Sequence, residues 1–223
     1  MSEEEAERFL STGTRPGPVH SNCSGKHAGM LALAVHHGWS PSGYRRAEHP
    51  VQLRMLAEVA RWCGIDQTEV GVGLDGCGVP CFQVPLRTMA VSFARFGHMA
   101  HEGEPPAQVL AAMTGHPGLV AGEGRLCTAL IEATEGRIVA KVGAEGVYAA
   151  CVPSERLGVA LKVEDGARRA AEVALVRVLE ELGLLSGPEL DLLGPHREIE
   201  LRNTLGEPVG VVRAAFALKG GRS

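Results

Sequence analysis

The sequence contains few aromatic residues, no long apolar run and no excess of positive charge. Aromatic residues make up 4% of the 223 residues, and the formal net charge at pH 7 is -4. The chain therefore lacks the basic footprint that nucleic acids and anionic membrane surfaces attract. No apolar run reaches the roughly 18 residues that a membrane-spanning helix needs. We therefore expect neither nucleic acid nor a membrane as a partner.

The first residues also lack the pattern of a secretory signal. They read MSEEEAERFL, acidic and polar where a signal peptide is basic and then apolar. We therefore expect a cytoplasmic protein, in which the six cysteines stay reduced. They are too widely spaced for a dense disulfide framework. Metal binding or catalysis is therefore the functional role to consider for them. With 45% apolar residues, the chain has enough material for a sizeable core.

Hydrophobic spacing predicts a helix-rich first part. Buried or short strands are expected at 69–74 and 82–84. Helix start and stop signals, such as Pro50 and Gly64 around the third helix, indicate where the helices begin and end. Helices are expected over 2–10, 27–37, 50–62, 86–96, 107–113 and 123–133.

The last third of the chain changes to short β-rich runs. Three such runs within residues 137–163 predict an antiparallel meander. The clearest helix of the chain follows at 165–182 and is expected to pack against that meander. Strands at 198–201 and 209–213 should form a closing hairpin. We therefore predict an α+β fold, with an antiparallel sheet and packed helices, in a single domain.

Two glycine-rich loops hold most of the groups that are suited to chemistry. The first, NCSGKH, leads into a helix for which Ser24 is the expected N-cap, and the second is DGCGVPC. Backbone N–H groups and the dipole at a helix start favour anions and thiolates. The reactive side chains of the two loops are Cys23, Lys26, His27, Asp75, Cys77 and Cys81.

The spacing within these loops is compatible with a zinc site. Cys23 and His27 lie four residues apart, and so do Cys77 and Cys81. This spacing matches no standard zinc finger, and free cysteines are often buried core residues, so an inert Cys81 is an equal alternative. Three further cysteines are expected to be core thiols: Cys63, Cys127 and Cys151.

Lysine and aspartate positions have both functional and structural explanations. Lys26 lies at a helix start, where a positive charge is mildly unfavourable, so it favours an anion, thiolate or metal neighbour over plain solvation. Asp75 is also an ordinary turn residue in Asp-Gly. Lys141 lies in a predicted strand and must point to solvent or into a site. The remaining histidines show no comparable spacing and are expected to be surface or structural residues.

Several motifs together resemble the asparaginase II family of bacterial asparaginases. They are NCSGKHAGMLA, EHPxQ, DGCGVP, KxGAEG and VGxVR, in this order between about His20 and Phe216. The resemblance implies a fold similar to that of the serine β-lactamases and penicillin-binding proteins. It also implies one asparaginase II-type domain over residues 1–223, with 1–19 as a poorly matched segment.

The resemblance assigns roles to individual residues. It implies a zinc centre with the ligands Cys23, Lys26 and Cys77, and so removes His27 and Cys81 from the metal set. It implies instead that His27 and Asp75 lie beside the substrate, and that the strand lysine of the family corresponds to Lys141. A ligating lysine must be neutral, so its pKa of ~10.4 has to fall, as a bound cation would cause.

The implied reaction is hydrolysis of the side-chain amide of L-asparagine to L-aspartate and ammonia. In the family a serine attacks the amide carbon, lysines act as its base, and water then hydrolyses the acyl-enzyme. The expected small-molecule partner is therefore L-asparagine, in asparagine catabolism, and the expected cofactor is zinc. The sequence leaves open whether the protein forms a homodimer, because nothing in it reveals the oligomeric state.

One part of the family pattern is missing from this sequence. No Ser or Thr is followed three residues later by Lys, whereas the family nucleophile lies in an S-x-x-K element before NCSGKH. The sequence thus resembles the C-terminal two-thirds of the enzyme, lacking the N-terminal part, and we expect it to be inactive alone. An alternative is a non-catalytic zinc-binding homologue or fragment. A third hypothesis is a cysteine enzyme in which Cys23, acidified at a helix start, works with His27.

Overall fold

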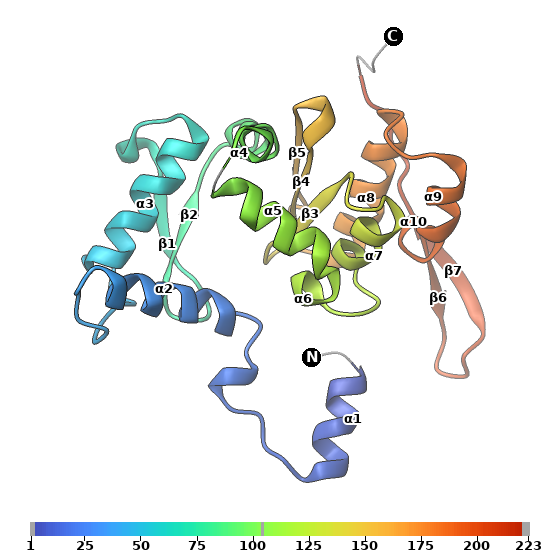
Figure 1. Ribbon diagram of the computed structural model, residues 1–223. Coiled ribbons are helices and arrows are strands. Elements are labelled where there is room, and N and C mark those ends of the chain that lie inside the picture. Colours follow the sequence, from blue (N-terminus) through green and yellow to red (C-terminus); the bar gives the residue numbers. More distant parts are fainter. Residues whose placement is uncertain (1–2, 104, 220–223) are drawn as a thin grey trace. The chain divides into compact units, whose positions relative to one another are not determined.

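The computed structural model describes residues 3–103 and 105–219 (Figure 1). The chain divides into two compact units, residues 1–84 and 85–223. Helices and three small antiparallel sheets make up the described residues, so the predicted α+β class is confirmed. None of the helices in these residues has the length and apolar character that crossing a bilayer requires.

The first unit is mostly helical. Its elements are α1 (Glu3–Thr12), α2 (Ser24–His36), α3 (Pro50–Cys63), β1 (Gly71–Leu74) and β2 (Pro80–Gln83), with 3-10 turns at Pro18–His20 and Gln67–Glu69. Helix α3 begins and ends as predicted, with Pro50 in its first turn and Gly64 in the left-handed conformation at φ 70° after its last residue. The predicted N-cap of α2 is wrong by one residue. Cys23 holds that position, because its carbonyl already accepts the His27 N–H at 3.0 Å.

The core of the first unit lies between α2, α3 and the β1–β2 hairpin. Met30, Ala34, Val51 and Val79 are buried together there. The predicted burial of the strand at 69–74 is wrong, since the side chains of β1 lie mostly at the surface. Its only strand partner in the described structure is β2. A two-stranded sheet does not cover the apolar residues of β1 as a larger sheet would, although their pattern is typical of a buried strand.

The second unit contains a three-stranded sheet and most of the helices. Its helices are α4 (Leu86–Glu102), α5 (Pro106–Gly115), α6 (Pro117–Ala121), α7 (Leu126–Ala133), α8 (Arg168–Glu181), α9 (Gly187–Leu192) and α10 (Gly194–Arg197). Its strands are β3 (Val139–Val142), β4 (Val147–Val152), β5 (Leu157–Lys162), β6 (Glu198–Arg202) and β7 (Pro208–Arg213). A further 3-10 turn, Pro153–Glu155, joins β4 to β5.

The predicted meander and its packing against the following helix are confirmed. The sheet has the order β3-β4-β5, and both pairs are antiparallel. Alternate residues of β4, such as Tyr148 and Ala150, are buried in one cluster with Leu175 and Leu179 of α8. Cys151 belongs to the other face, where it is buried with residues of α4 and α5. Figure 1 shows these two helices beside the sheet. Because both faces are covered, β4 is the centre of this unit.

Helix α4 approaches strand β5 unusually closely. A Cβ atom built on Gly158 would lie 1.9 Å from the backbone carbonyl oxygen of Ala90 and 2.7 Å from the backbone nitrogen of Ala94. Atoms of a helix backbone cannot move aside individually, so only glycine permits this contact. The helix and the sheet therefore meet backbone to backbone at Gly158.

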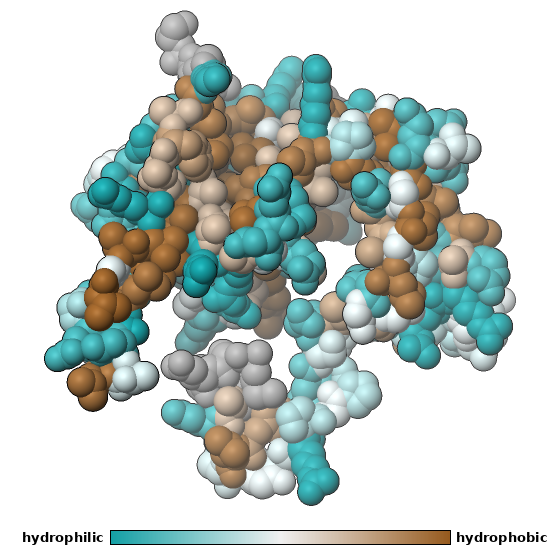
Figure 2. Space-filling model, turned by 180° about the vertical axis from the view of Figure 1, so that it is seen from behind, coloured by the Kyte–Doolittle hydropathy of each residue, from teal (hydrophilic) through white to brown (hydrophobic). Residues whose placement is uncertain are grey.

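The predicted β6–β7 hairpin is confirmed, with each strand one residue longer toward the turn than predicted and a register shift between Leu201 and Arg202. Its outward side chains include apolar ones: Leu205, Val209 and Val211 are 80%, 64% and 47% exposed. Figure 2 shows hydrophobic side chains grouped on this hairpin. An isolated two-stranded hairpin is marginally stable, so the contacts of both strands with α8 help to hold it in place.

Candidate functional site

The candidate site of the first unit is built from the start of α2 and the loop between β1 and β2. Cys23 and Lys26 lie three residues apart at the helix start, so their side chains share one face. The loop is a tight turn in which Asp75 N–H donates to the Val79 carbonyl at 2.9 Å and Gly78 N–H to the Asp75 carbonyl at 2.8 Å. Gly78 has φ +83°, a conformation that favours glycine. This turn gives Asp75 and the loop thiol fixed positions.

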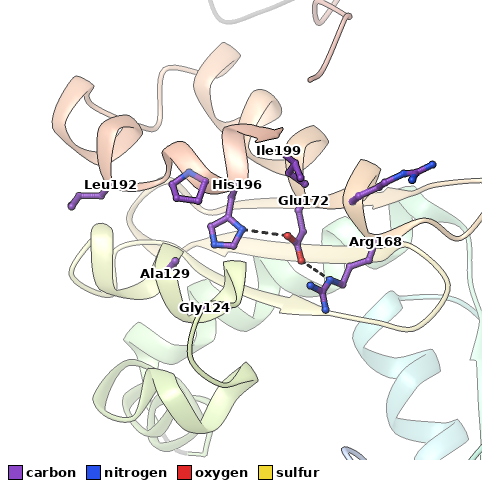
Figure 3. Close-up of a pocket in the computed structure, with 9 residues that line it drawn as sticks. Gly124, Ala129, Arg168, Glu172, Leu192, His196 and Ile199 are labelled. Atoms are coloured by element: carbon purple, nitrogen blue, oxygen red, sulfur yellow. Dashed lines mark hydrogen bonds and ion pairs between the residues drawn. The ribbon is translucent and has the colours of Figure 1, made fainter. Parts of the chain in front are cut away.

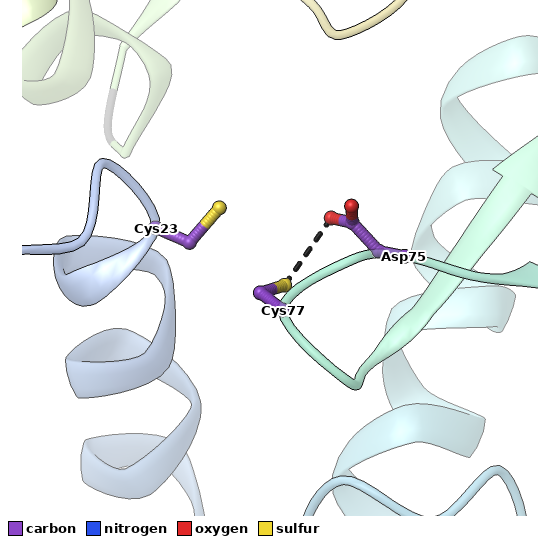
Figure 4. A group of neighbouring side chains, drawn as sticks. All are labelled: Cys23, Asp75 and Cys77. Atoms are coloured by element: carbon purple, nitrogen blue, oxygen red, sulfur yellow. Dashed lines mark hydrogen bonds between the residues drawn. The ribbon is translucent and has the colours of Figure 1, made fainter. Parts of the chain in front are cut away.

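Four reactive side chains meet at this point. One ligand atom each from Cys23, Asp75 and Cys77 lies within 4.8 Å of the others (Figure 4). The Cys77 thiol donates to Asp75 Oδ2 at 3.2 Å, and Lys26 Nζ donates to the same oxygen at 2.7 Å. The structure thus brings together the three residues that the resemblance assigns to the metal. It also adds Asp75, which the resemblance places beside the substrate.

The charges of the cluster stabilise one another. The hydrogen bonds from Lys26 and then from Cys77 hold the pKa of the Asp75 carboxyl below its usual value. Partial burial lowers the pKa of Lys26, but hydrogen bonds with Asp75 and Cys77 outweigh it and raise the pKa above the ordinary value. Burial, followed by the hydrogen bond with Cys77, raises the pKa of the Cys23 thiol. This direction is the opposite of what the cysteine-enzyme hypothesis requires, because that hypothesis depends on an acidified Cys23.

The donor set is suited to zinc. Cysteine sulfur, carboxylate oxygen and neutral amine nitrogen are all acceptable ligands, and soft thiolates select for zinc over hard cations. Tetrahedral zinc with ligands at ~2.0–2.3 Å needs ligand atoms ~3.5 Å apart. The ligand atoms now lie within 4.8 Å of one another. Side-chain rotations that move them by about 1 Å would bring them to the spacing of a zinc site. Cys23 and Cys77 supply two ligands, and either Lys26 or Asp75 can supply the third.

His27 has a different set of contacts. Its Nδ1 lies 2.6 Å from the Tyr44 hydroxyl, and the two rings meet edge to face. Tyr44 is held in turn, because its carbonyl accepts a hydrogen bond from Gln52 Nε2 at 2.8 Å, and Gln52 is buried. Tyr44 is not among the site residues predicted from the sequence. The only available signal was Gln52, the last residue of the EHPxQ motif.

A comparison with protein families bears on this geometry. A model of the family described as L-asparaginase II matches residues 1–214. The chain belongs to the L-asparaginase II family. No curated protein matches the sequence. The resemblance that the motifs indicate is therefore confirmed, and the matched residues include both loops of the site.

Within this L-asparaginase II chain, the four-residue zinc set inferred from spacing alone is wrong. Cys81 is exposed and does not belong to the cluster. Its sulfur lies beside Gly73 of the neighbouring strand, where a Cβ atom built on that glycine would be 3.3 Å away. It lies in β2, beyond the turn, so the strand carries its side chain away from Cys77. His27 is likewise absent from the cluster and contacts Tyr44 instead.

The other cysteines of this family member are core residues, as predicted. Cys63, Cys127 and Cys151 are buried. Burial raises the pKa of the Cys151 thiol to about 12, so this thiol stays protonated and unreactive at neutral pH. Cys127 accepts the Val142 N–H at 3.2 Å and thereby ties α7 to β3.

Lys141 belongs to the second unit of the asparaginase II chain. It lies on β3 opposite Ala149, and its side chain is exposed. Its ammonium group donates to the carbonyl of the neighbouring Val142 at 2.8 Å. The side chain thus points away from the buried core, which leaves its proton accessible to a bound molecule.

Proposed function

We propose that this protein is a zinc-dependent L-asparagine amidohydrolase in which residues 1–223 supply the metal centre, substrate contacts and one lysine of the catalytic machinery. The observation that carries the proposal is the cluster of Cys23, Lys26, Asp75 and Cys77 in a chain that belongs to the L-asparaginase II family. Two loops 49 residues apart in sequence converge there, which a purely structural turn does not require.

The protein side chains have distinct tasks in this proposal. Cys23, Lys26 and Cys77 hold the metal, which when bound would act as a Lewis acid that polarises a carbonyl oxygen. Asp75 offers a carboxylate to the ammonium group of L-asparagine. His27 is kept in one orientation by Tyr44, so its remaining nitrogen can hydrogen-bond the substrate.

The proton chemistry falls to lysine in this proposal. Lys141 takes and returns protons in the serine–lysine reaction. No Ser or Thr in residues 1–223 precedes a Lys by three positions, so none has the serine–lysine spacing of the family. The proposal therefore assigns binding and proton transfer to these residues and names no nucleophile among them.

The alternative is a zinc-binding homologue without catalytic activity. It is favoured by the missing serine–lysine element and uses the same metal centre. For residues 1–223 alone, the two proposals differ in specific recognition of L-asparagine by His27 and Asp75.

Purified residues 1–223 loaded with zinc should bind L-asparagine but release ammonia no faster than a buffer control. Loss of a nucleophile removes several orders of magnitude in rate, and the remaining groups only position the substrate. Calorimetry measures the binding, and a coupled ammonia assay measures turnover. Asp75→Asn should weaken binding, whereas Asp66→Asn, an exposed aspartate of the same unit, should not.

Two results would contradict this prediction. Absence of L-asparagine binding would favour the non-catalytic alternative. Turnover that survives metal removal but disappears in Cys23→Ala would establish a thiol mechanism in its place.

The third zinc ligand can be identified by counting protons. If Lys26 ligates, zinc binding releases a proton from it in addition to the two thiol protons, and affinity rises more steeply with pH. The logarithm of the affinity should gain ~3 units per pH unit well below the ligand pKa values, against ~2 in Lys26→Met. Competition with a chromophoric chelator at several pH values measures both slopes. Equal slopes, together with a larger loss in Asp75→Asn, would assign the third position to Asp75.

A further inference from the structure

A second site of a different kind lies in the second unit. A pocket of about 500 Å³ opens beside the first turns of α8, against α10 and the start of β6 (Figure 3). Its polar lining comes from Arg168, Arg169, Glu172 and His196. None of these side chains takes part in the cluster of the first unit or in the roles proposed for L-asparagine hydrolysis.

The inner wall of the pocket is a buried carboxylate with two partners. Glu172 is only 5% exposed, and its two oxygens are engaged separately. Oε1 forms an ion pair with Arg168 Nε at 2.8 Å, and Oε2 accepts from His196 Nδ1 at 3.3 Å (Figure 3). A carboxylate only accepts hydrogen bonds, so the shared proton belongs to Nδ1 of the imidazole. The charge of Glu172 is therefore compensated within the protein.

The second nitrogen of the imidazole is not used by the part of the protein that the structure describes. His196 is 9% exposed and lines the pocket, and its Nε2 has no hydrogen-bond partner among the residues that the structure describes. A histidine oriented through Nδ1 by a carboxylate, with Nε2 left available, is the arrangement that proteins use for binding and proton transfer. A purely structural link between α8 and α10 would explain Glu172 but would not require an open Nε2.

The pocket also has positive charge that no described acidic side chain compensates. Arg168 uses Nε for Glu172, and no partner of its two terminal nitrogens lies within the described ranges. Arg169 is exposed and forms no ion pair with any residue that the structure describes. Both arginines lie in the first turn of a 14-residue helix, where the dipole disfavours cations. Two guanidinium groups against one carboxylate leave a net positive charge that an anion would balance.

The rest of the lining is apolar. Leu192 is 67% exposed, and with Pro195, Ile199 and Ala129 it forms the apolar wall of the pocket. Planar guanidinium groups match both carboxylate and phosphate. A phosphate dianion, however, has no use for an apolar wall and would lie beside the carboxylate of Glu172. A molecule with one carboxylate and a short alkyl part uses both kinds of lining.

We propose that this pocket binds a small aliphatic monocarboxylate. The carboxylate pairs with the free guanidinium nitrogens of Arg168 and Arg169, and the alkyl part packs against Leu192 and Ile199. With its proton on Nδ1, His196 offers only an acceptor at Nε2, so it lines the pocket without a hydrogen bond to the carboxylate. Binding at this pocket does not depend on asparaginase activity, and it stands or falls independently of the metal centre.

An NMR titration of the intact chain tests the proposal, with sodium butyrate as the probe and inorganic phosphate at matched ionic strength as the second arm. We expect butyrate to shift the amide signals of residues 168, 169 and 196 at lower concentrations than phosphate does. Arg169→Gln should weaken butyrate binding roughly tenfold, the effect of losing one charged hydrogen-bond partner. Arg87→Gln is the matched control, because Arg87 is also exposed and is also the second residue of a long helix in this unit.

A second variant tests the apolar wall. Leu192→Glu changes an exposed side chain, so the fold should persist, and it should weaken butyrate binding by placing a like charge beside the alkyl part. Several results would overturn the proposal: no shifts at these residues, equal weakening by Arg169→Gln and Arg87→Gln, or no effect of Leu192→Glu. Tighter binding of phosphate than of butyrate would overturn the assigned ligand class.

Discussion

Replacing Cys77 with serine should lower the zinc affinity of residues 1–223 by roughly a thousandfold or more, because each thiolate supplies a large share of the binding free energy of a zinc site. Cys77 is well placed for this role. Its sulfur lies within 4.8 Å of ligand atoms of both Cys23 and Asp75, and its thiol already donates to Asp75. A serine hydroxyl keeps the size but is a poor zinc ligand. Competition with a chromophoric chelator measures the change.

The chain provides its own control for this experiment. Cys81 lies four residues later, in the same hairpin, but is exposed and outside the cluster. Cys81→Ser should therefore bind zinc as tightly as the unchanged protein. If it lost as much affinity as Cys77→Ser, the four-residue set of Cys23, His27, Cys77 and Cys81 would replace the one proposed here. Circular dichroism of both variants without added zinc would separate a ligand effect from unfolding.

Gly158→Ala should cost the second unit roughly 3 kcal/mol of unfolding free energy or more, or prevent it from folding. The added methyl group would lie 1.9 Å from the Ala90 carbonyl oxygen, well inside any contact distance. To relieve the clash, α4 would have to withdraw from β5. This would loosen the packing of α4 against the face of the sheet that carries Cys151. Urea unfolding followed by circular dichroism measures the loss.

Gly210→Ala is the matched control, since Gly210 also lies in a strand of the second unit. An added Cβ there has only Leu201 Cδ1 nearby, at 3.8 Å, which is an ordinary contact. Its unfolding free energy should therefore change by no more than about 0.5 kcal/mol. Equal stability of the two variants would show that α4 and β5 do not meet as described.

Elements that depend on neighbours in sequence could be predicted well. Pro50 and Gly64 mark the two ends of α3 because the first tolerates a missing N–H and the second adopts the left-handed conformation. The meander between 137 and 163 follows from apolar runs and turns within a few residues of one another. Ser24 was misjudged as an N-cap by one residue, because cap position depends on backbone angles that side-chain type does not determine.

The candidate site was only partly accessible from sequence. The loops with Cys23 and Cys77 were recognisable by their glycines and thiols, and the family resemblance selected Lys26 as their companion. Asp75 could equally have been a turn residue. Its contact with Lys26 at 2.7 Å joins positions 49 residues apart, and no local pattern carries that information.

What the sequence determined by itself was the longer helices and the strands, the membership of the L-asparaginase II family and the two loops that carry reactive groups. The short helices α6, α9 and α10 were not predicted. Only the tertiary structure decided that Asp75 joins the thiols, that Tyr44 holds His27, that Cys81 is excluded, and that His196 opens into a pocket. The physical reason is the range of the interactions. Hydrogen bonds along the backbone and turn conformations act over a few residues, whereas a side-chain cluster depends on where packing places segments that are distant along the chain.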